Sequence, residues 1–111
     1  MSRTMKMLYG PAAVPSSATT IYTSPADTRT TVQYIHVTNS AAGTAGSFVL
    51  SKGAVGASNV FYVARSGADR IPAAGGLFER FVQFTLEPGE TLQCVGDPQL
   101  SLTLNGFTET W

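Results

Sequence analysis

Short runs of β-branched and aromatic residues, separated by Gly, Pro, Asn or Ser, recur along nearly the whole chain. The most regular run extends from Leu100 to Asn105, where leucines alternate with polar residues. Strand patterns with turn signals about every eight to twelve residues are typical of an antiparallel β-sandwich or barrel. No segment repeats the helical spacing of apolar residues, so the sequence predicts almost no helix.

The pattern predicts an all-β fold, a small antiparallel β-sandwich or jelly-roll-like barrel of about seven strands. The expected strands cover residues 19–23, 30–39, 47–52, 59–65, 77–86 and 91–95, and the last begins at Leu100. In the second of these, Val32 and Ile35 have opposite parity, which indicates either a bulge near Gln33 or burial of both faces. In the fifth, Phe81 lies opposite the other apolar residues, so we expect a bulge or a sheet edge near Glu79 and Arg80.

A chain of 111 residues forms one domain, because two separate cores would each be too small. We expect residues 1–17 to be an extended N-terminal arm, since its prolines resist both helix and central strand, and residues 18–111 to be the β-sandwich. The arm is rich in apolar residues and could lie along its own sandwich or on a neighbouring protein. Gly106 is expected to shift the alternation of the last strand. The candidate interface residues are Met5, Met7, Leu8, Tyr9, Phe107 and Trp111.

Charged residues make up only 13% of the chain, and seven basic and seven acidic side chains give a formal net charge of zero. A surface of Ser, Thr, Ala and Gly loses its hydration at a low cost in free energy, which favours permanent packing against other proteins. Thr-rich solvent faces are, however, also ordinary in β proteins. The absence of a basic stripe argues against nucleic acid and against anionic membrane surfaces as partners.

The residues indicate no catalytic site, no metal site and no cofactor, so we expect the protein not to be an enzyme. The single histidine, His36, lies inside a strand, and the acidic residues near turns show ordinary surface placement. One His and one Cys cannot supply the usual ligands of a zinc site. Cys94 is expected to be a buried small hydrophobe, and a lone cysteine excludes an intramolecular disulfide. No signal peptide or bilayer-spanning run is visible, so we expect the protein to be used without crossing a membrane on its own.

Aromatic side chains could instead form a carbohydrate platform, as in β-sandwich binding modules that recognise host receptors. The candidates are Tyr22, Tyr34, Phe61, Tyr62 and Trp111. Core packing is the more common use of such residues in a chain with one tryptophan.

The order of segments resembles a family of small structural proteins of tailed bacteriophages that infect actinobacteria. The matching segments are Leu8 to Ala12, Ala18 to Ala26, Ile35 to Asn39, Phe48 to Gly53 and Leu86 to Gln93. The resemblance implies a non-enzymatic virion component, a minor tail or tail-tip protein or a capsid decoration protein. It also implies assembly in the cytoplasm of the bacterial host, contact with other virion proteins and a homo-oligomeric state.

Overall fold

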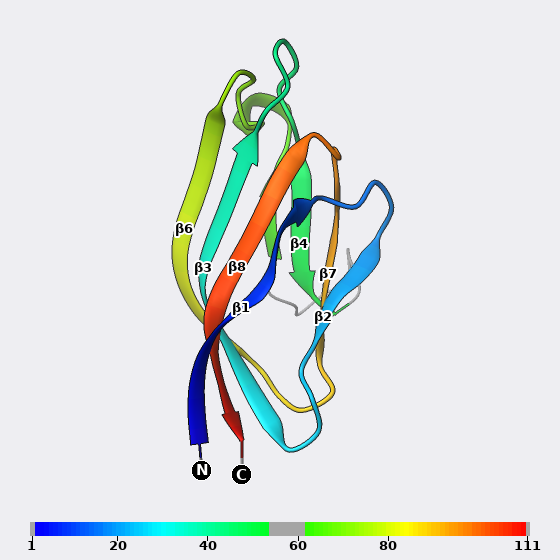
Figure 1. The fold of residues 1–111 in the computed structure, drawn as a ribbon. Coiled ribbons are helices and arrows are strands. Elements are labelled where there is room, and N and C mark those ends of the chain that lie inside the picture. The colour runs from blue at the N-terminus through cyan, green and yellow to red at the C-terminus, as the bar shows by residue number, and fades with distance from the viewer. Residues whose placement is uncertain (1, 54–61, 111) are drawn as a thin grey trace.

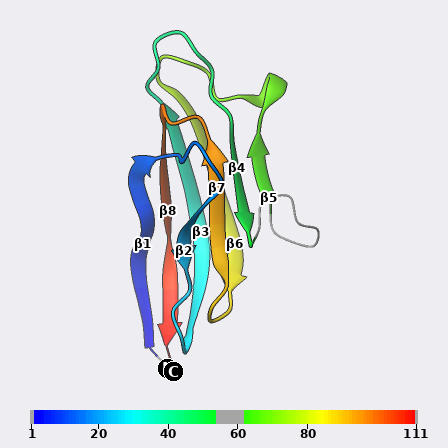
Figure 2. The same ribbon diagram turned by 90° about the vertical axis from the view of Figure 1, so that its right-hand side faces the viewer.

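The computed structural model describes residues 2–53 and 62–110. These residues form two antiparallel sheets of four strands each, which pack face to face as a β-sandwich (Figures 1 and 2). The strands are β1 (Ser2–Ala13), β2 (Thr19–Thr23), β3 (Thr28–Asn39), β4 (Phe48–Lys52), β5 (Tyr62–Arg65), β6 (Gly76–Leu86), β7 (Thr91–Gly96) and β8 (Leu100–Thr110). The first sheet has the order β1-β8-β3-β6 and the second the order β2-β7-β4-β5. The predicted all-β sandwich is confirmed.

The described ranges contain eight strands, one more than expected, and the extra strand comes from the N-terminus. The extended arm over residues 1–17 is not confirmed, because Ser2–Ala13 pairs with β8 from Ser2↔Thr110 to Ala13↔Ser101. Figure 2 shows β1 beside β8 at the sheet edge. Register shifts on both sides of Tyr9 accommodate the Gly10-Pro11 segment, whose proline cannot donate to the ladder. Leu8 and Val14 are buried in the core, so this segment lies along its own sandwich.

The core lies between the two sheets and is built from alternating residues of the central strands. Leu100, Leu102 and Leu104 of β8 are almost completely buried, as their period of two predicts. Ile35 and Val37 of β3 lie beside them, and Leu50 and Leu92 of the second sheet belong to the same cluster. Burial of a leucine side chain stabilises a fold by roughly 2 kcal/mol, so this cluster is the main source of stability.

Two predicted irregularities occur in the first sheet. The pairing of β3 with β8 shifts between Val32 and Tyr34 with one extra residue in β3, which confirms a bulge at Gln33. In the pairing of β3 with β6, the extra residue lies on β6, between Phe81 and Phe84. β6 lies at the edge of its sheet, which confirms the edge alternative for the Glu79 and Arg80 region. Together these features turn Tyr34 and Phe81 to the same face of the sheet, where they are direct neighbours.

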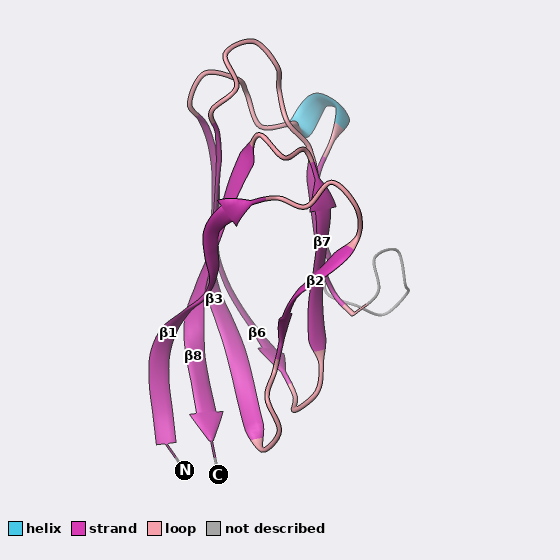
Figure 3. Cartoon of the chain, turned by 45° about the vertical axis from the view of Figure 1, so that its right-hand side comes forward, coloured by secondary structure: helices cyan, strands magenta, loops and turns pink. Residues whose placement is uncertain are grey.

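Helical structure in the described part of the chain is limited to one 3₁₀ turn, Gly67–Asp69 (Figure 3). The loop after β3 is held by the buried amide of Asn39, which donates to the carbonyls of Thr44 and Ile71 at 2.9 and 3.1 Å. The side-chain oxygen of Asn39 accepts a hydrogen bond from the backbone N–H of Ala41 at 3.0 Å. These bonds, with the Gly46↔Ile71 bridge, close the end of the sandwich from which β6 starts.

Candidate functional site

The most distinctive surface is the face of the β1-β8-β3-β6 sheet that points away from the second sheet, here called the outer face. In residues 2–53 and 62–110, the large hydrophobic side chains that are strongly exposed all come from its two edge strands. They are Met5 (67% exposed) and Met7 (54%) on β1, and Leu77 (53%) and Phe81 (80%) on β6. The core residues of these strands have the opposite parity, so these four side chains all belong to the outer face.

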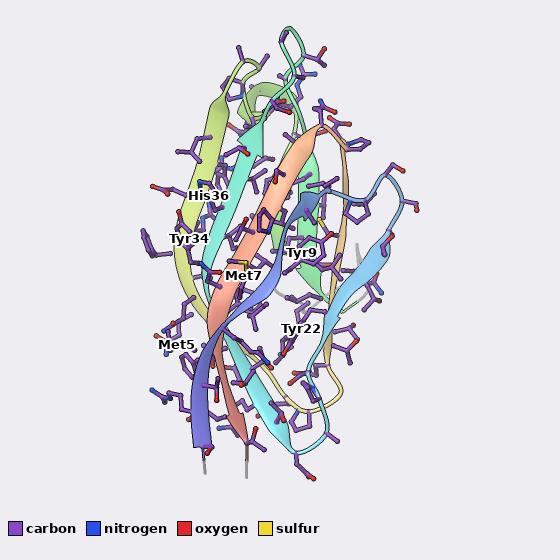
Figure 4. The ribbon with its side chains drawn as sticks, in the orientation of Figure 1. Met5, Met7, Tyr9, Tyr22, Tyr34 and His36 are labelled. Atoms are coloured by element: carbon purple, nitrogen blue, oxygen red, sulfur yellow. The ribbon has the colours of Figure 1, made fainter. Side chains whose placement is uncertain are left out.

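The middle of the outer face is a row of four residues that are direct neighbours across the strands, here called the central row. In strand order it consists of Met7, Asn105, Tyr34 and Phe81. Figure 4 shows Met7 on β1 and Tyr34 on β3, over the same sheet. Apolar side chains therefore occupy both ends of a row whose middle is polar and aromatic.

Tyr34 is the centre of an aromatic cluster on this face. Its ring centroid lies 4.9 Å from that of Phe81 and 5.8 Å from that of His36, with which it stacks. Its hydroxyl donates a 2.5 Å hydrogen bond to the carboxylate of Glu79, and this bond raises the pKa of Tyr34. Beside it, the buried Oδ1 atom of Asn105 has no hydrogen-bond partner within the described structure. An unsatisfied buried acceptor costs free energy, so this atom lowers the stability of the isolated domain.

A second row, here called the charged row, lies at the end of the sheet where the two termini meet (Figure 1). In strand order it consists of Arg3, Glu109, Arg29 and Glu87, so its signs alternate. Arg3 pairs with Glu109 at 3.1 Å, and the Nε atom of Arg29 donates to both carboxylate oxygens of Glu87 at 3.0 Å. The hydrogen bond and charge of Glu87 raise the pKa of Arg29.

The structure separates the candidate interface residues into two groups. Met5 and Met7 lie exposed on the outer face, whereas Leu8 is a core residue. Tyr9 packs against the core and its hydroxyl donates to the carbonyl of Ala13 at 3.2 Å. Phe107 is buried beneath the guanidinium of Arg3, which lies 4.3 Å from its ring centroid. Trp111 lies outside the described residues.

Leu77 and Phe81 were not among the interface residues expected from the sequence. The signal that could have found Phe81 was its parity within residues 77–86, which is opposite to that of Phe78 in the core. Because the partner strands were unknown, parity alone could not place it beside Tyr34.

The candidate sugar-binding aromatics are not gathered into one platform by the residues that the structure describes. Tyr22 is partly buried in β2, and its hydroxyl lies 3.1 Å from that of Thr30. Tyr34 is on the outer face of the other sheet. Phe61, Trp111 and the side chain of Tyr62 lie outside the described residues.

The single histidine lies beside the aromatic cluster of the outer face. His36 is partly buried and stacks on Tyr34, next to Glu79 across the strands. Within the described ranges, no group of three or more His, Cys, Asp or Glu side chains could hold a metal ion. The same residues include no helix with the length and apolar character needed to span a bilayer.

Cys94 is fully buried in β7, and burial raises the pKa of its thiol to about 12. We therefore expect Ellman's reagent at about pH 8 to react with the denatured chain but at least about 100-fold more slowly with the native protein. In the unfolded chain the thiol ionises near pH 8.5. The neutral buried thiol thus stabilises the fold below that pH, and this contribution is lost as the pH rises toward 12. Equal labelling rates for native and denatured protein would contradict the burial.

Comparison with known proteins gives no match, since no protein-family model, curated protein or solved structure is significantly similar to this chain. The resemblance to structural proteins of tailed phages therefore stays a prediction from the sequence.

Proposed function

We propose that this protein is a non-enzymatic structural component of a tailed-phage virion. In this proposal it docks in multiple copies on other virion proteins, as a minor tail or tail-tip protein or as a capsid decoration protein. It is made in the cytoplasm of the bacterial host and acts within the particle. The observation that carries the proposal is the concentration of exposed Met5, Met7, Leu77 and Phe81 on one sheet face.

An exposed group of large hydrophobic side chains on one face is a recognised mark of a protein interaction site. Here the group lies on a sheet whose backbone is fixed by strand pairing, so docking would cost little conformational entropy. The low content of charged residues acts in the same direction, because few ions must lose their hydration. The resemblance of the sequence to phage structural proteins suggests that the particle into which such a domain assembles is a virion.

A second candidate function is carbohydrate binding by the aromatic cluster of the outer face. Phe81 is 80% exposed, and the hydroxyl of its neighbour Tyr34 donates a hydrogen bond to the carboxylate of Glu79. An exposed ring beside a carboxylate is a common arrangement for stacking on a sugar and accepting its hydroxyls. Against it, the ring of Tyr34 has His36 and Phe81 as close neighbours, which leaves less ring surface for a sugar.

The proposal is tested by replacing Phe81 with Asp in the phage genome that encodes the chain. Phe81 is highly exposed, so the domain should fold normally, while a charge on the outer face should oppose burial against a neighbour. We expect quantitative mass spectrometry of purified particles to show at least about a tenfold loss of the protein. For the unmodified protein, hundreds of copies per particle would indicate capsid decoration, and a few would indicate the tail tip.

Thr20→Asp is the matched control, because Thr20 is exposed on the second sheet, away from the outer face. It should leave incorporation unchanged. If the unmodified protein is absent from particles, or if Phe81→Asp is incorporated as well as Thr20→Asp, the proposal is wrong. Specific binding of the isolated domain on a glycan array, lost with Phe81→Asp, would support the carbohydrate candidate instead.

A further inference from the structure

We infer that the outer face is self-complementary and that a second copy of this chain docks on it, face to face, about a two-fold axis parallel to the strands. This inference rests on the proposed function, because it names the first neighbour of the assembling protein. The axis reverses the order of the four strands, so β1 of one copy lies over β6 of the other. Residues of one row stay level with the same row of the partner.

The charged row is complementary to itself under this operation. Its signs from β1 to β6 are plus, minus, plus, minus, from Arg3, Glu109, Arg29 and Glu87. Reversal of the order places minus over plus at each position. Arg3 of one copy then lies over Glu87 of the other, and Glu109 lies over Arg29. Charges at the rim of an interface mainly fix its orientation and register, which is the role expected for this row.

The central row is matched by the same operation. Met7 of one copy lies over Phe81 of the other, and Asn105 lies over Tyr34. Methionine sulfur and methyl groups pack favourably against aromatic rings. The exposed Met7 and Phe81 side chains thus cover each other, while Met5 lies over Thr85 and Leu77 lies over Ala13.

The size and charge of the surface suit a stable dimer. The four strands have 11 or 12 residues each. At about 4.8 Å between strands and about 3.3 Å per residue, the face measures roughly 19 by 36 Å, or about 700 Å². Standard interfaces bury about 800 Å² per partner. A formal net charge of zero means that two copies do not repel each other.

Other arrangements of two copies fit the observations less well. An axis in the plane of the interface but perpendicular to the strands would lay β1 over β1 and bring the charged rows to opposite ends of the dimer. Pairing of the β1 edges would leave Phe81 and Leu77 uncovered on the far edge. Neither arrangement uses the alternation of the charged row.

Sedimentation of the purified protein at tens of micromolar tests the state of association. We expect a dimer for the unmodified chain and for Thr20→Asp, and a monomer for Phe81→Asp. Because Phe81 and Thr20 are both exposed, circular dichroism and thermal melting should show that all three proteins are folded. If the unmodified chain sediments as a monomer, the inference is wrong.

Thiol cross-linking tests the two-fold axis. A linker that spans about 10 Å, the distance between packed sheets, should join Met7→Cys to Phe81→Cys in an equimolar mixture. It should also join Arg3→Cys to Glu87→Cys. Met7→Cys alone should not be cross-linked, since the two copies of that position would lie about 17 Å apart. The buried Cys94 should not react, so the unmodified protein is the blank.

The outcomes separate this inference from the proposed function. Efficient cross-linking of Met7→Cys to itself, without the mixed products, would reject the strand-parallel axis. A monomeric protein that is nevertheless incorporated into particles would reject only the inference. A dimer with the expected cross-links that is absent from particles would reject only the virion role.

Discussion

Replacing Gly106 by Ala is expected to destabilise the domain by about 3 kcal/mol or more, a large fraction of the roughly 5–15 kcal/mol that holds a domain folded. Gly106 lies in β8 between β1 and β3, opposite Lys6 and Val32. A Cβ atom at this position would lie 1.9 Å from the carbonyl oxygen of Thr31, and 3.1 Å from the Cα atom of Val32. These are backbone atoms of a central strand, so the neighbour cannot move aside without breaking the ladder.

Gly43→Ala is the matched control for this change. No described heavy atom lies within 4 Å of a Cβ built there, and the residue is in an exposed loop. Urea unfolding followed by circular dichroism should give a stability close to that of the unmodified chain for Gly43→Ala. The close approach of β3 to β8 would be refuted if Gly106→Ala unfolded at the same urea concentration as Gly43→Ala.

Leu104→Ala is expected to cost about 2–5 kcal/mol, because it removes a fully buried side chain from the centre of the sandwich. Leu104 lies in β8 beside Ile35 of β3, and both belong to the core cluster. The truncated side chain would leave a cavity that the surrounding strands cannot close, since their backbones are held by pairing on both sides. The free energy of unfolding, measured in urea, gives the size of the effect.

The same chemical change at Leu77 is the control, because Leu77 is 53% exposed on the outer face. Leu77→Ala should change the stability of the isolated domain by less than about 0.5 kcal/mol. Dimerisation would add stability to the unmodified chain at high protein concentration, so both measurements belong at a concentration where the protein is monomeric. Equal losses for Leu104→Ala and Leu77→Ala would mean that the core assignment of β8 is wrong.

Local sequence patterns were sufficient where one strand or one turn decides the outcome. The alternation from Leu100 to Leu104 predicted which residues of β8 are buried, and the change of parity near Gln33 predicted the bulge of β3. Turn geometry is equally local: in the Glu87 to Glu90 turn, Gly89 adopts a φ of +85° and the N–H of Glu90 donates to the carbonyl of Glu87 at 2.9 Å.

The N-terminal segment shows where local patterns fail. Apolar residues and prolines in residues 1–17 were compatible with an arm on a neighbour or with a tucked segment. The choice depends on whether β8 offers a free edge, which is a property of the sheet order. Because β8 accepts β1 on one side and β3 on the other, the segment becomes an edge strand and Leu8 is buried.

The candidate site depends still more on long-range pairing. The sequence by itself determined the all-β class, the alternation of the core and the low content of charged residues, because these follow from period and composition. Only the tertiary structure decided that Met7, Tyr34 and Phe81 form one row and that Arg3, Arg29 and Glu87 form another. The physical reason is that strand register is fixed by contacts between residues far apart in the chain, and a shift of one residue would turn each of these side chains to the other face.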